Sequence, residues 1–135
     1  MRKTALLLAA LATLAVGTAT AATRPPAIRY VDDQFGPVLA TPKQQALYYW
    51  TAENDFRIHC KFACAKVWPP LVVRSRAAVP THVPGIKGTF GTIRRAAGRF
   101  QVTFNRRPIY TYAHEGPTEV RCDNVGGWFV VRLRD

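Results

Sequence analysis

Two glutamates stand at matching places in the sequence and are the first candidates for chemistry. Glu53 and Glu115 each follow an aromatic run, Tyr48 to Trp50 in one case and Tyr110 to Tyr112 in the other. A glycosidase needs two carboxyl groups roughly 5 to 10 Å apart, so an enzyme acting through this pair is one hypothesis. A carboxylate that follows a strand more often accepts backbone N–H groups of the next turn. We favour that structural role and assign no catalytic residue.

Three cysteines form the second candidate group. Cys60 and Cys64 are four residues apart, and on one helical turn their Cα atoms would lie about 6 Å apart, within the range of a disulfide. We therefore favour a Cys60–Cys64 disulfide, with Cys122 as a free thiol or the site of an intermolecular bridge. The alternative is a bridge from one of the pair to Cys122, which closes a loop of about 60 residues.

A histidine beside the first cysteine raises the question of a metal or haem site. Covalent haem attachment needs Cys-x-x-Cys-His, whereas His59 precedes the first cysteine here. A copper or zinc site is chemically sensible, but a disulfide would remove its thiolates. We expect no metal and no cofactor, and we keep a redox or metal-handling protein as the alternative interpretation. The ligands of such a site would be His59, Cys60 and Cys64, joined by His82, His114 or Cys122.

Templates for nucleophilic catalysis find little support. The only serine, Ser75, has no nucleophile-elbow context, and no positioned histidine can be identified for Cys122 beside Asp123. Aromatic side chains of the Tyr48 and Tyr110 runs could stack on sugars, but alternating aromatics in strands more often belong to a core. The chain is therefore expected not to be an enzyme.

An internal repeat organises the chain. Residues 36–53 and 98–115 align without a gap at an offset of 62, and each copy continues to a tryptophan, Trp68 or Trp128. Turn and aromatic residues match in the same order, which favours a duplication. We place the two pseudo-repeats at about 36–71 and 98–133. The identical pairs are Gly36 and Gly98, Thr41 and Thr103, Tyr48 and Tyr110, and Glu53 and Glu115.

Each copy is predicted to form a β-hairpin, because two β-prone runs flank a polar turn. The hairpin strands are expected at 38–41 and 47–51 in the first copy and at 100–104 and 109–112 in the second, with further strands at 27–31, 89–94 and 128–133. Since side chains alternate along a strand, Tyr48 and Trp50 should share one face, as should Tyr110 and Tyr112. The sequence predicts a small all-β domain with mainly antiparallel strands.

One segment between the copies has helical spacing. Apolar residues recur through 56–67 at intervals that suit a helix, and this segment contains the Cys-x-x-x-Cys sequence. Trp68, Pro69 and Pro70 should end it, because proline removes an N–H donor and pushes the preceding residue out of the α region. From 74 to 88 the chain reads as a surface loop.

The first 21 residues have the layout of a secretory signal peptide. Arg2 and Lys3 precede an apolar stretch of twelve residues, Ala5 to Val16, and Ala19-Thr20-Ala21 is a small-x-small cleavage site. Twelve residues are too few for a membrane span, which needs about 20 in a helix. We expect cleavage after Ala21, a single exported domain at 22–135 in the periplasm or secreted, and no transmembrane segment after cleavage.

The exported domain is strongly basic. The chain has 19 Lys and Arg against 8 Asp and Glu, and removal of Arg2 and Lys3 leaves 17 − 8 = +9. Such a field attracts anionic partners without specifying them. For an exported protein we expect an anionic envelope component or an acidic protein as partner, and no nucleic acid.

These residues also resemble a bacterial family, the "secreted repeat of unknown function", whose members are described as predicted lipoproteins. Tyr48-x-Trp50-x-x-Glu53 and Tyr110-x-Tyr112-x-x-Glu115 look like its Tyr-x-(aromatic)-x-x-Asp motif, with Glu in place of Asp. Cys60-x-x-x-Cys64-Ala65-x-x-Trp68-Pro69-Pro70 resembles the segment between its two motifs. The resemblance covers about Val38 to Leu133 and implies an envelope or secreted location, with no established enzymatic activity. The lipid-attachment cysteine of many members is missing here.

Overall fold

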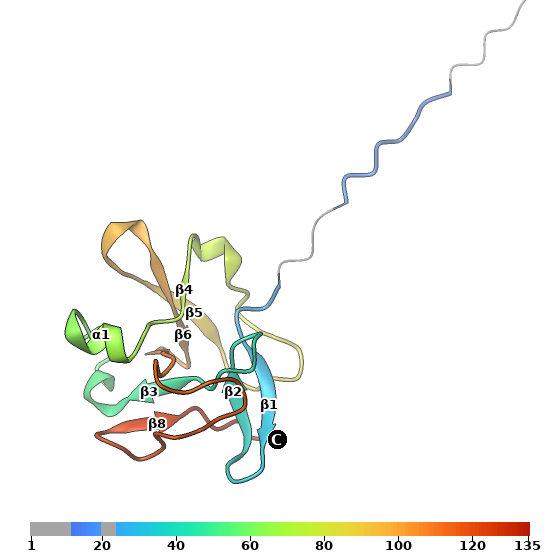
Figure 1. The fold of residues 1–135 in the computed structure, drawn as a ribbon. Coiled ribbons are helices and arrows are strands. Elements are labelled where there is room, and N and C mark those ends of the chain that lie inside the picture. Colours follow the sequence, from blue (N-terminus) through green and yellow to red (C-terminus); the bar gives the residue numbers. More distant parts are fainter. Residues whose placement is uncertain (1–11, 20–23) are drawn as a thin grey trace, which may run out of the picture.

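The structure, a computed structural model, describes residues 12–19 and 24–135. Most of the proposed signal peptide, with Arg2, Lys3 and Ala21, lies outside these residues. From Ile28 onward the chain folds into short antiparallel strands with very little helix (Figure 1), which confirms the predicted all-β class. Among the helices of the described residues, none has the length and apolar character needed to cross a membrane.

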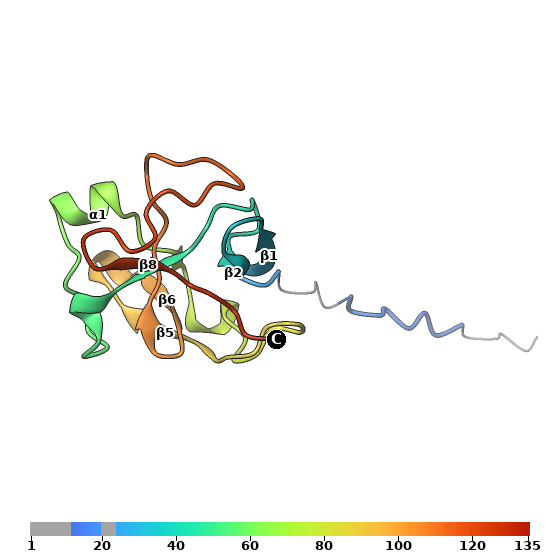
Figure 2. The same ribbon diagram turned by 90° about the horizontal axis from the view of Figure 1, so that it is seen from below.

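Three groups of antiparallel strands make up the fold. The β1–β2 hairpin stands at one side, and the β3–β8 pair lies beneath the β4–β6–β5 sheet in the view of Figure 1. Figure 2 shows the same arrangement from below. The strands are β1 (Ile28–Asp32), β2 (Gly36–Ala40), β3 (Tyr48–Trp50), β4 (Val72–Val73), β5 (Phe90–Arg94), β6 (Phe100–Phe104), β7 (Arg107–Pro108) and β8 (Trp128–Val130). Short 3-10 turns occupy Thr51–Glu53, Arg76–Ala78 and Ala96–Gly98.

The first predicted hairpin is only partly correct. A bridge joins Ala40 to Ala46, and the N–H of Leu47 donates to the carbonyl of Leu39. The next N–H, that of Tyr48, donates instead to the carbonyl of Tyr110 at 2.8 Å. Pairing with β2 therefore ends at Leu47, and β3 forms its antiparallel ladder with β8.

The second hairpin is tighter than predicted. The four-residue turn expected at 105–108 is a two-residue turn, Asn105 and Arg106, with φ of 49° and 70°. Positive φ at both central residues is the geometry of a type I′ turn, which matches the twist of the flanking strands. Arg107 and Pro108 therefore form β7 against β6, and Tyr110 continues into isolated bridges with Tyr48 and Pro70.

The helix is shorter than the segment predicted for it. Only Ala63–Val67 forms α1, and it contains Cys64 of the Cys60–Cys64 disulfide. Residues 56–62 are not helical, because Phe56 and Phe62 have φ of 62° and 53°, which lie outside the right-handed helical region. The helix stops before Trp68 and the two prolines, as proline chemistry predicts.

Two hydrophobic clusters lie on opposite sides of the central strands. Leu47 and Ile109 belong to one cluster, and Tyr48 and Tyr110 belong to the other. This separation follows from the alternation of side chains along each strand. The first cluster supports the β4–β6–β5 sheet, and the second holds the aromatic residues of the motifs.

The same backbone contacts occur in both copies of the repeat. The N–H of Val131 donates to the carbonyl of Leu47, and the N–H of Leu71 donates to that of Ile109. Where the copies meet, Tyr48 and Tyr110 exchange both backbone hydrogen bonds, at 2.8 and 2.9 Å. The two copies are thus arranged about a local two-fold axis that passes between these tyrosines.

We expect Gly88→Ala to destabilise the fold more than Gly85→Ala. Both glycines have positive φ, 140° and 81°, so alanine strains the backbone at either position by about 1–2 kcal/mol. At position 88 the new Cβ would also lie within 2.3 Å of the ring of the buried Phe104, whereas at 85 nothing lies within 4 Å. Urea unfolding should show Gly88→Ala to be the less stable variant by about 1–3 kcal/mol. Equal losses would contradict this packing.

Candidate functional site

The motif tyrosines and glutamates form two crossed pairs. The Tyr48 hydroxyl donates to Glu115 Oε2 at 2.8 Å, and the Tyr110 hydroxyl lies 2.7 and 2.9 Å from the two carboxylate oxygens of Glu53. Each tyrosine therefore binds the glutamate of the other copy. All four side chains are buried; the exposed fraction is 1% for Glu53 and 7% for Glu115.

Glu53 is fully satisfied by hydrogen bonds. Its Oε1 accepts the backbone N–H of His59 at 2.7 Å and that of Cys60 at 2.9 Å, in addition to the Tyr110 hydroxyl. The 3-10 turn that ends β3 places the glutamate under this loop. Glu53 thus fixes the chain that leads into the Cys60–Cys64 disulfide.

Glu115 has fewer partners in the same arrangement. Its Oε2 accepts the Tyr48 hydroxyl and the backbone N–H of Arg121 at 3.0 Å, but its Oε1 is buried without a hydrogen-bond partner. Burial raises the pKa of Glu115 above its usual value, which the Arg121 and Tyr48 hydrogen bonds offset only in part. The Glu115 carboxylate therefore has fewer hydrogen-bond donors than that of Glu53.

The two tyrosines act as fixed donors. Burial raises the pKa of Tyr48 and of Tyr110 far above the usual value, and the adjacent carboxylates add to the effect. Both hydroxyls keep their protons at any physiological pH and hold the glutamates in place. Because each carboxylate accepts this donor and backbone N–H groups, the geometry supports a structural role and not a pair of catalytic acids.

The remaining motif aromatics form a continuous stack. Trp128 lies between Trp50 and Trp68, with ring centroids 5.3 and 3.9 Å away and interplanar angles of 2° and 6°. Tyr112 follows Trp68 at 4.8 Å. Trp68 and Trp128 are buried, and the carbonyl of Pro69 accepts the N–H of Thr111 at 2.9 Å. These rings fill the core between the copies and present no broad platform to a ligand.

The cysteines follow the predicted pairing. Cys60 and Cys64 form a disulfide, and Cys122 is a buried free thiol. Cys122 stands 62 residues after Cys60, and the residue at the same offset from Cys64 is Gly126. Burial raises the pKa of the Cys122 thiol, so it is a poor nucleophile in the folded protein.

The residues considered as metal ligands do not converge. His59 Nε2 lies 2.7 Å from a carboxylate oxygen of Asp55, and the thiolates of Cys60 and Cys64 are replaced by the disulfide. Within residues 12–19 and 24–135, no group of three His, Cys, Asp or Glu side chains is placed to hold a metal ion.

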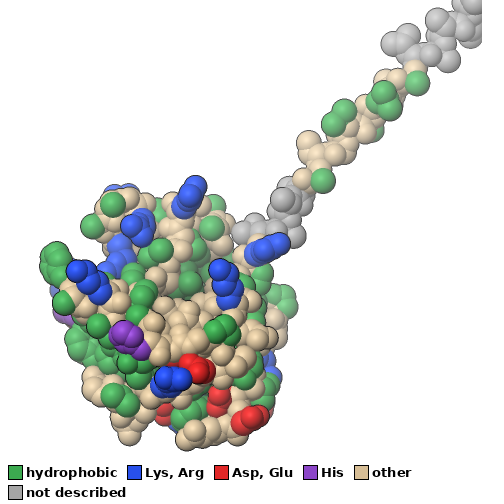
Figure 3. All heavy atoms as spheres, viewed as in Figure 1, with side chains coloured by type: hydrophobic (Ala, Val, Ile, Leu, Met, Phe, Trp, Pro, Cys, Tyr) green, Lys and Arg blue, Asp and Glu red, His purple; other side chains and the backbone are tan. Residues whose placement is uncertain are grey.

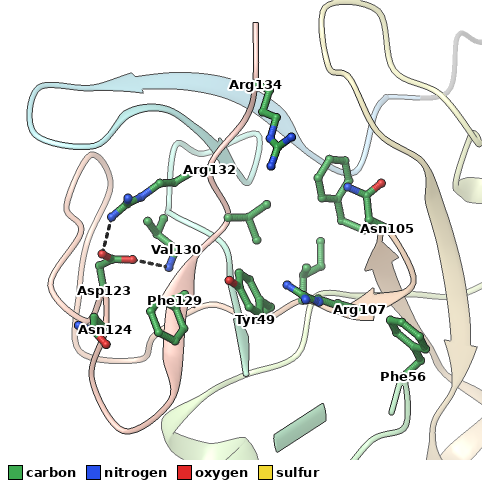
Figure 4. Close-up of a pocket in the computed structure, with 13 residues that line it drawn as sticks. Tyr49, Phe56, Asn105, Arg107, Asp123, Asn124, Phe129, Val130, Arg132 and Arg134 are labelled. Atoms are coloured by element: carbon green, nitrogen blue, oxygen red, sulfur yellow. Dashed lines mark hydrogen bonds and ion pairs between the residues drawn. The ribbon is translucent and has the colours of Figure 1, made fainter. Parts of the chain in front are cut away.

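A groove that sequence reasoning missed lies across β3, β7 and β8 (Figure 4). Its volume is about 960 Å³. Arginines enter it from β7 and from the chain that follows β8, and aromatic rings form part of its wall. Its lining includes Tyr49, Phe56, Arg107, Asp123, Phe129, Arg132 and Arg134.

The arginines of the groove differ in their partners. The guanidinium of Arg107 lies over the ring of Tyr49, 4.5 Å from its centroid, and Tyr49 stacks against Phe129 at 5.8 Å. Arg132 is paired with Asp123 at 2.6 Å. Among the described residues, Arg107 and Arg134 form no ion pair with a carboxylate. Two cationic heads in this groove are therefore available to an anion.

The sequence did contain a signal for this groove. Arg132 and Arg134 alternate with the buried residues Val131 and Leu133 at the end of the chain, so both arginines point to the same outer face. What the sequence does not show is that the turn after β6 brings Arg107 to that face.

We expect Glu53→Gln to destabilise the protein more than Glu115→Gln. A glutamine at position 53 has only one acceptor oxygen for the two backbone N–H groups and the Tyr110 hydroxyl. The free energy of unfolding should therefore fall by about 1–3 kcal/mol. At position 115 the amide group can occupy the place of the unpartnered Oε1. Denaturant unfolding at neutral pH provides the comparison, and equal losses would show that the two pairs are equivalent.

Glu115→Gln should also change how the stability depends on pH. Because the pKa of Glu115 is raised in the folded state, the folded state binds its proton more tightly than the unfolded chain. The free energy of unfolding therefore falls as pH rises from the ordinary glutamate pKa through the raised one. Glu115→Gln should remove this fall, which begins at the ordinary glutamate pKa. An unchanged pH profile in this variant would argue against the raised pKa.

Thiol titration should find one thiol per chain, and only after unfolding. Cys60 and Cys64 are joined, and Cys122 is buried with a raised pKa. Without reductant, the native protein should react slowly with a thiol reagent, and the denatured protein should release one equivalent. Cys122→Ala should release none. Three reactive thiols, or fast reaction in the native state, would contradict this arrangement.

The chain matches no protein-family model, and no similar chain is found among curated proteins or solved structures. The resemblance to the secreted repeat family therefore stays a hypothesis that depends on the motif residues themselves.

Proposed function

We propose that this protein is an exported, non-enzymatic envelope protein that binds an anionic ligand in the groove across β3, β7 and β8. One observation carries the proposal: three arginines line this groove together with a single carboxylate, Asp123. Asp123 is occupied by Arg132 and by the backbone N–H of Val130. A carboxylate, sulfate or phosphate group entering the groove would meet Arg107 and Arg134.

The aromatic wall suggests what accompanies the anionic group. Tyr49 and Phe129 are half-buried and stack on one another, and Arg107 lies over the ring of Tyr49, so aromatic and cationic groups adjoin in this wall. Carbohydrate rings pack on such surfaces through their C–H faces, and a volume of about 960 Å³ lies within the usual range for a small-molecule site. An acidic sugar unit of an envelope polysaccharide therefore fits this groove.

The net charge supports the same class of ligand. Two of the eight acidic residues, Glu53 and Glu115, are buried against tyrosines, so the outer surface is more basic than the total charge indicates. The proposed signal peptide and the disulfide support an extracytoplasmic location, where disulfides persist. No observation specifically favours the alternative redox or metal-handling function, since His59 faces Asp55 and the two nearest thiols are bonded to each other.

Arginine variants test the groove directly. We expect the wild-type protein to bind polygalacturonate, whose sugar rings each carry a carboxylate, with an affinity that falls as salt rises. Arg107→Ala and Arg134→Ala should each raise Kd about tenfold, because a charge-assisted hydrogen bond contributes about 1.5–3 kcal/mol. Isothermal titration calorimetry at two salt concentrations gives both quantities.

Lys43→Ala is the matched control for charge. Lys43 is exposed in the β2–β3 turn and does not line the groove, so this variant should change Kd by less than about twofold. A loss equal to that of the arginine variants would indicate diffuse electrostatic attraction and overturn the assignment of the groove. Absence of salt-sensitive binding by the wild-type protein would overturn the proposed function.

A further inference from the structure

A phenylalanine projects from the tip of the disulfide loop. Phe62 lies within the small ring closed by Cys60 and Cys64, and 87% of its surface is exposed. A single exposed apolar side chain is common on a protein surface, so the anchoring of this loop and the charge of its neighbours decide what Phe62 can do. Val67, at the other end of α1, is 39% exposed.

The base of this loop is firmly held. Cys60 is completely buried, its N–H donates to Glu53 Oε1 at 2.9 Å, and its carbonyl accepts Arg95 Nη2 at 3.0 Å. Phe62 itself has φ of 53° and ψ of −118°, a sparsely populated conformation that persists only where the surroundings impose it. The anchored disulfide loop therefore holds Phe62 with its side chain exposed to solvent.

The chain segment that carries the tip is cationic. Residues 56–114 contain eleven Lys or Arg and no Asp or Glu, so every acidic residue lies before or after this segment. Figure 3 shows the result: Lys and Arg side chains gather over the upper part of the molecule, where α1, β4 and β5 lie in Figure 1, and most visible acidic side chains lie below. Lys61 and Lys66, which flank Phe62 in the sequence, are both exposed.

We propose that this tip docks the protein on an anionic phospholipid surface, with Phe62 entering the headgroup region and Lys61 and Lys66 binding lipid phosphates. An aromatic ring on a convex tip needs no preformed pocket in its partner, and the interfacial region of a bilayer accepts such rings. The acid-free segment supplies the long-range attraction to negative lipid. This proposal does not depend on the groove, which is lined by other residues.

Vesicle partitioning tests the role of Phe62. The domain of residues 22–135 should sediment with vesicles of phosphatidylcholine containing phosphatidylglycerol, and much less with vesicles of phosphatidylcholine alone. Phe62→Ala should lower the partition coefficient by about fivefold to tenfold, the loss expected for partial burial of an aromatic side chain. Since Phe62 is exposed, this variant should unfold at the same denaturant concentration as the wild type, which circular dichroism can verify.

Two matched controls distinguish docking through the tip from nonspecific adsorption to the vesicles. Val31→Ala shortens another exposed apolar side chain, 58% exposed on β1 beside Asp32, and should leave partitioning unchanged. Lys66→Ala should weaken it about fivefold, whereas Lys43→Ala, with the same change in charge outside the acid-free segment, should have a smaller effect.

A soluble polyanion distinguishes lipid insertion from charge binding. Phe62→Ala should bind dextran sulfate as the wild type does, because no interface is available to the ring. The proposal is overturned if Phe62→Ala partitions into anionic vesicles like the wild type, if Val31→Ala loses as much, or if dextran sulfate binding falls in parallel. Loss of polygalacturonate binding in the groove variants with intact vesicle binding would confirm that the two sites are separate.

Discussion

The crossed hydrogen bonds between Tyr48 and Glu115 and between Tyr110 and Glu53 are the constraint on which the rest of the structure depends. The same two tyrosines also exchange two backbone hydrogen bonds, so side chains and main chains connect the two copies at one place. A buried carboxylate is stable only with donors around it. Neither copy supplies its own tyrosine donor, and each glutamate therefore requires the partner copy to be folded.

Both proposed binding features are positioned by this centre. Tyr49, on the opposite face of β3 from Tyr48, points into the groove where Arg107 lies over its ring. Glu53 holds the N–H groups of His59 and Cys60, which anchor the loop that carries Phe62. A polar interaction in the core thus positions two surface features, neither of which is built from the motif residues themselves.

Much of this fold can be read from the sequence, and the exceptions have physical causes. Alternation predicted that Tyr48 and Trp50 share one face of their strand, and the four-residue spacing predicted the Cys60–Cys64 disulfide. The ladder partner of β3 could not be found in this way, because pairing with β8 is a contact between residues about 80 positions apart. The groove was missed for the same reason, since only tertiary structure brings Arg107 and Arg134 to the same groove.

Cys60 forms a disulfide, whereas Cys122 at the matching position is a free thiol, and this difference bears on how such a chain can arise. If the copies descend from one half-length ancestor, that ancestor would have made its crossed tyrosine–glutamate contacts across the two-fold axis of a homodimer, whose formation depends on concentration. Joining the halves would make that association intramolecular. Positions 64 and 126 could then differ, and in this chain Cys64 closes a disulfide loop whereas Gly126 stands at the matching offset. In a symmetric homodimer both halves carry the same residue at each position, so only a fused chain can place different functional features on its two halves.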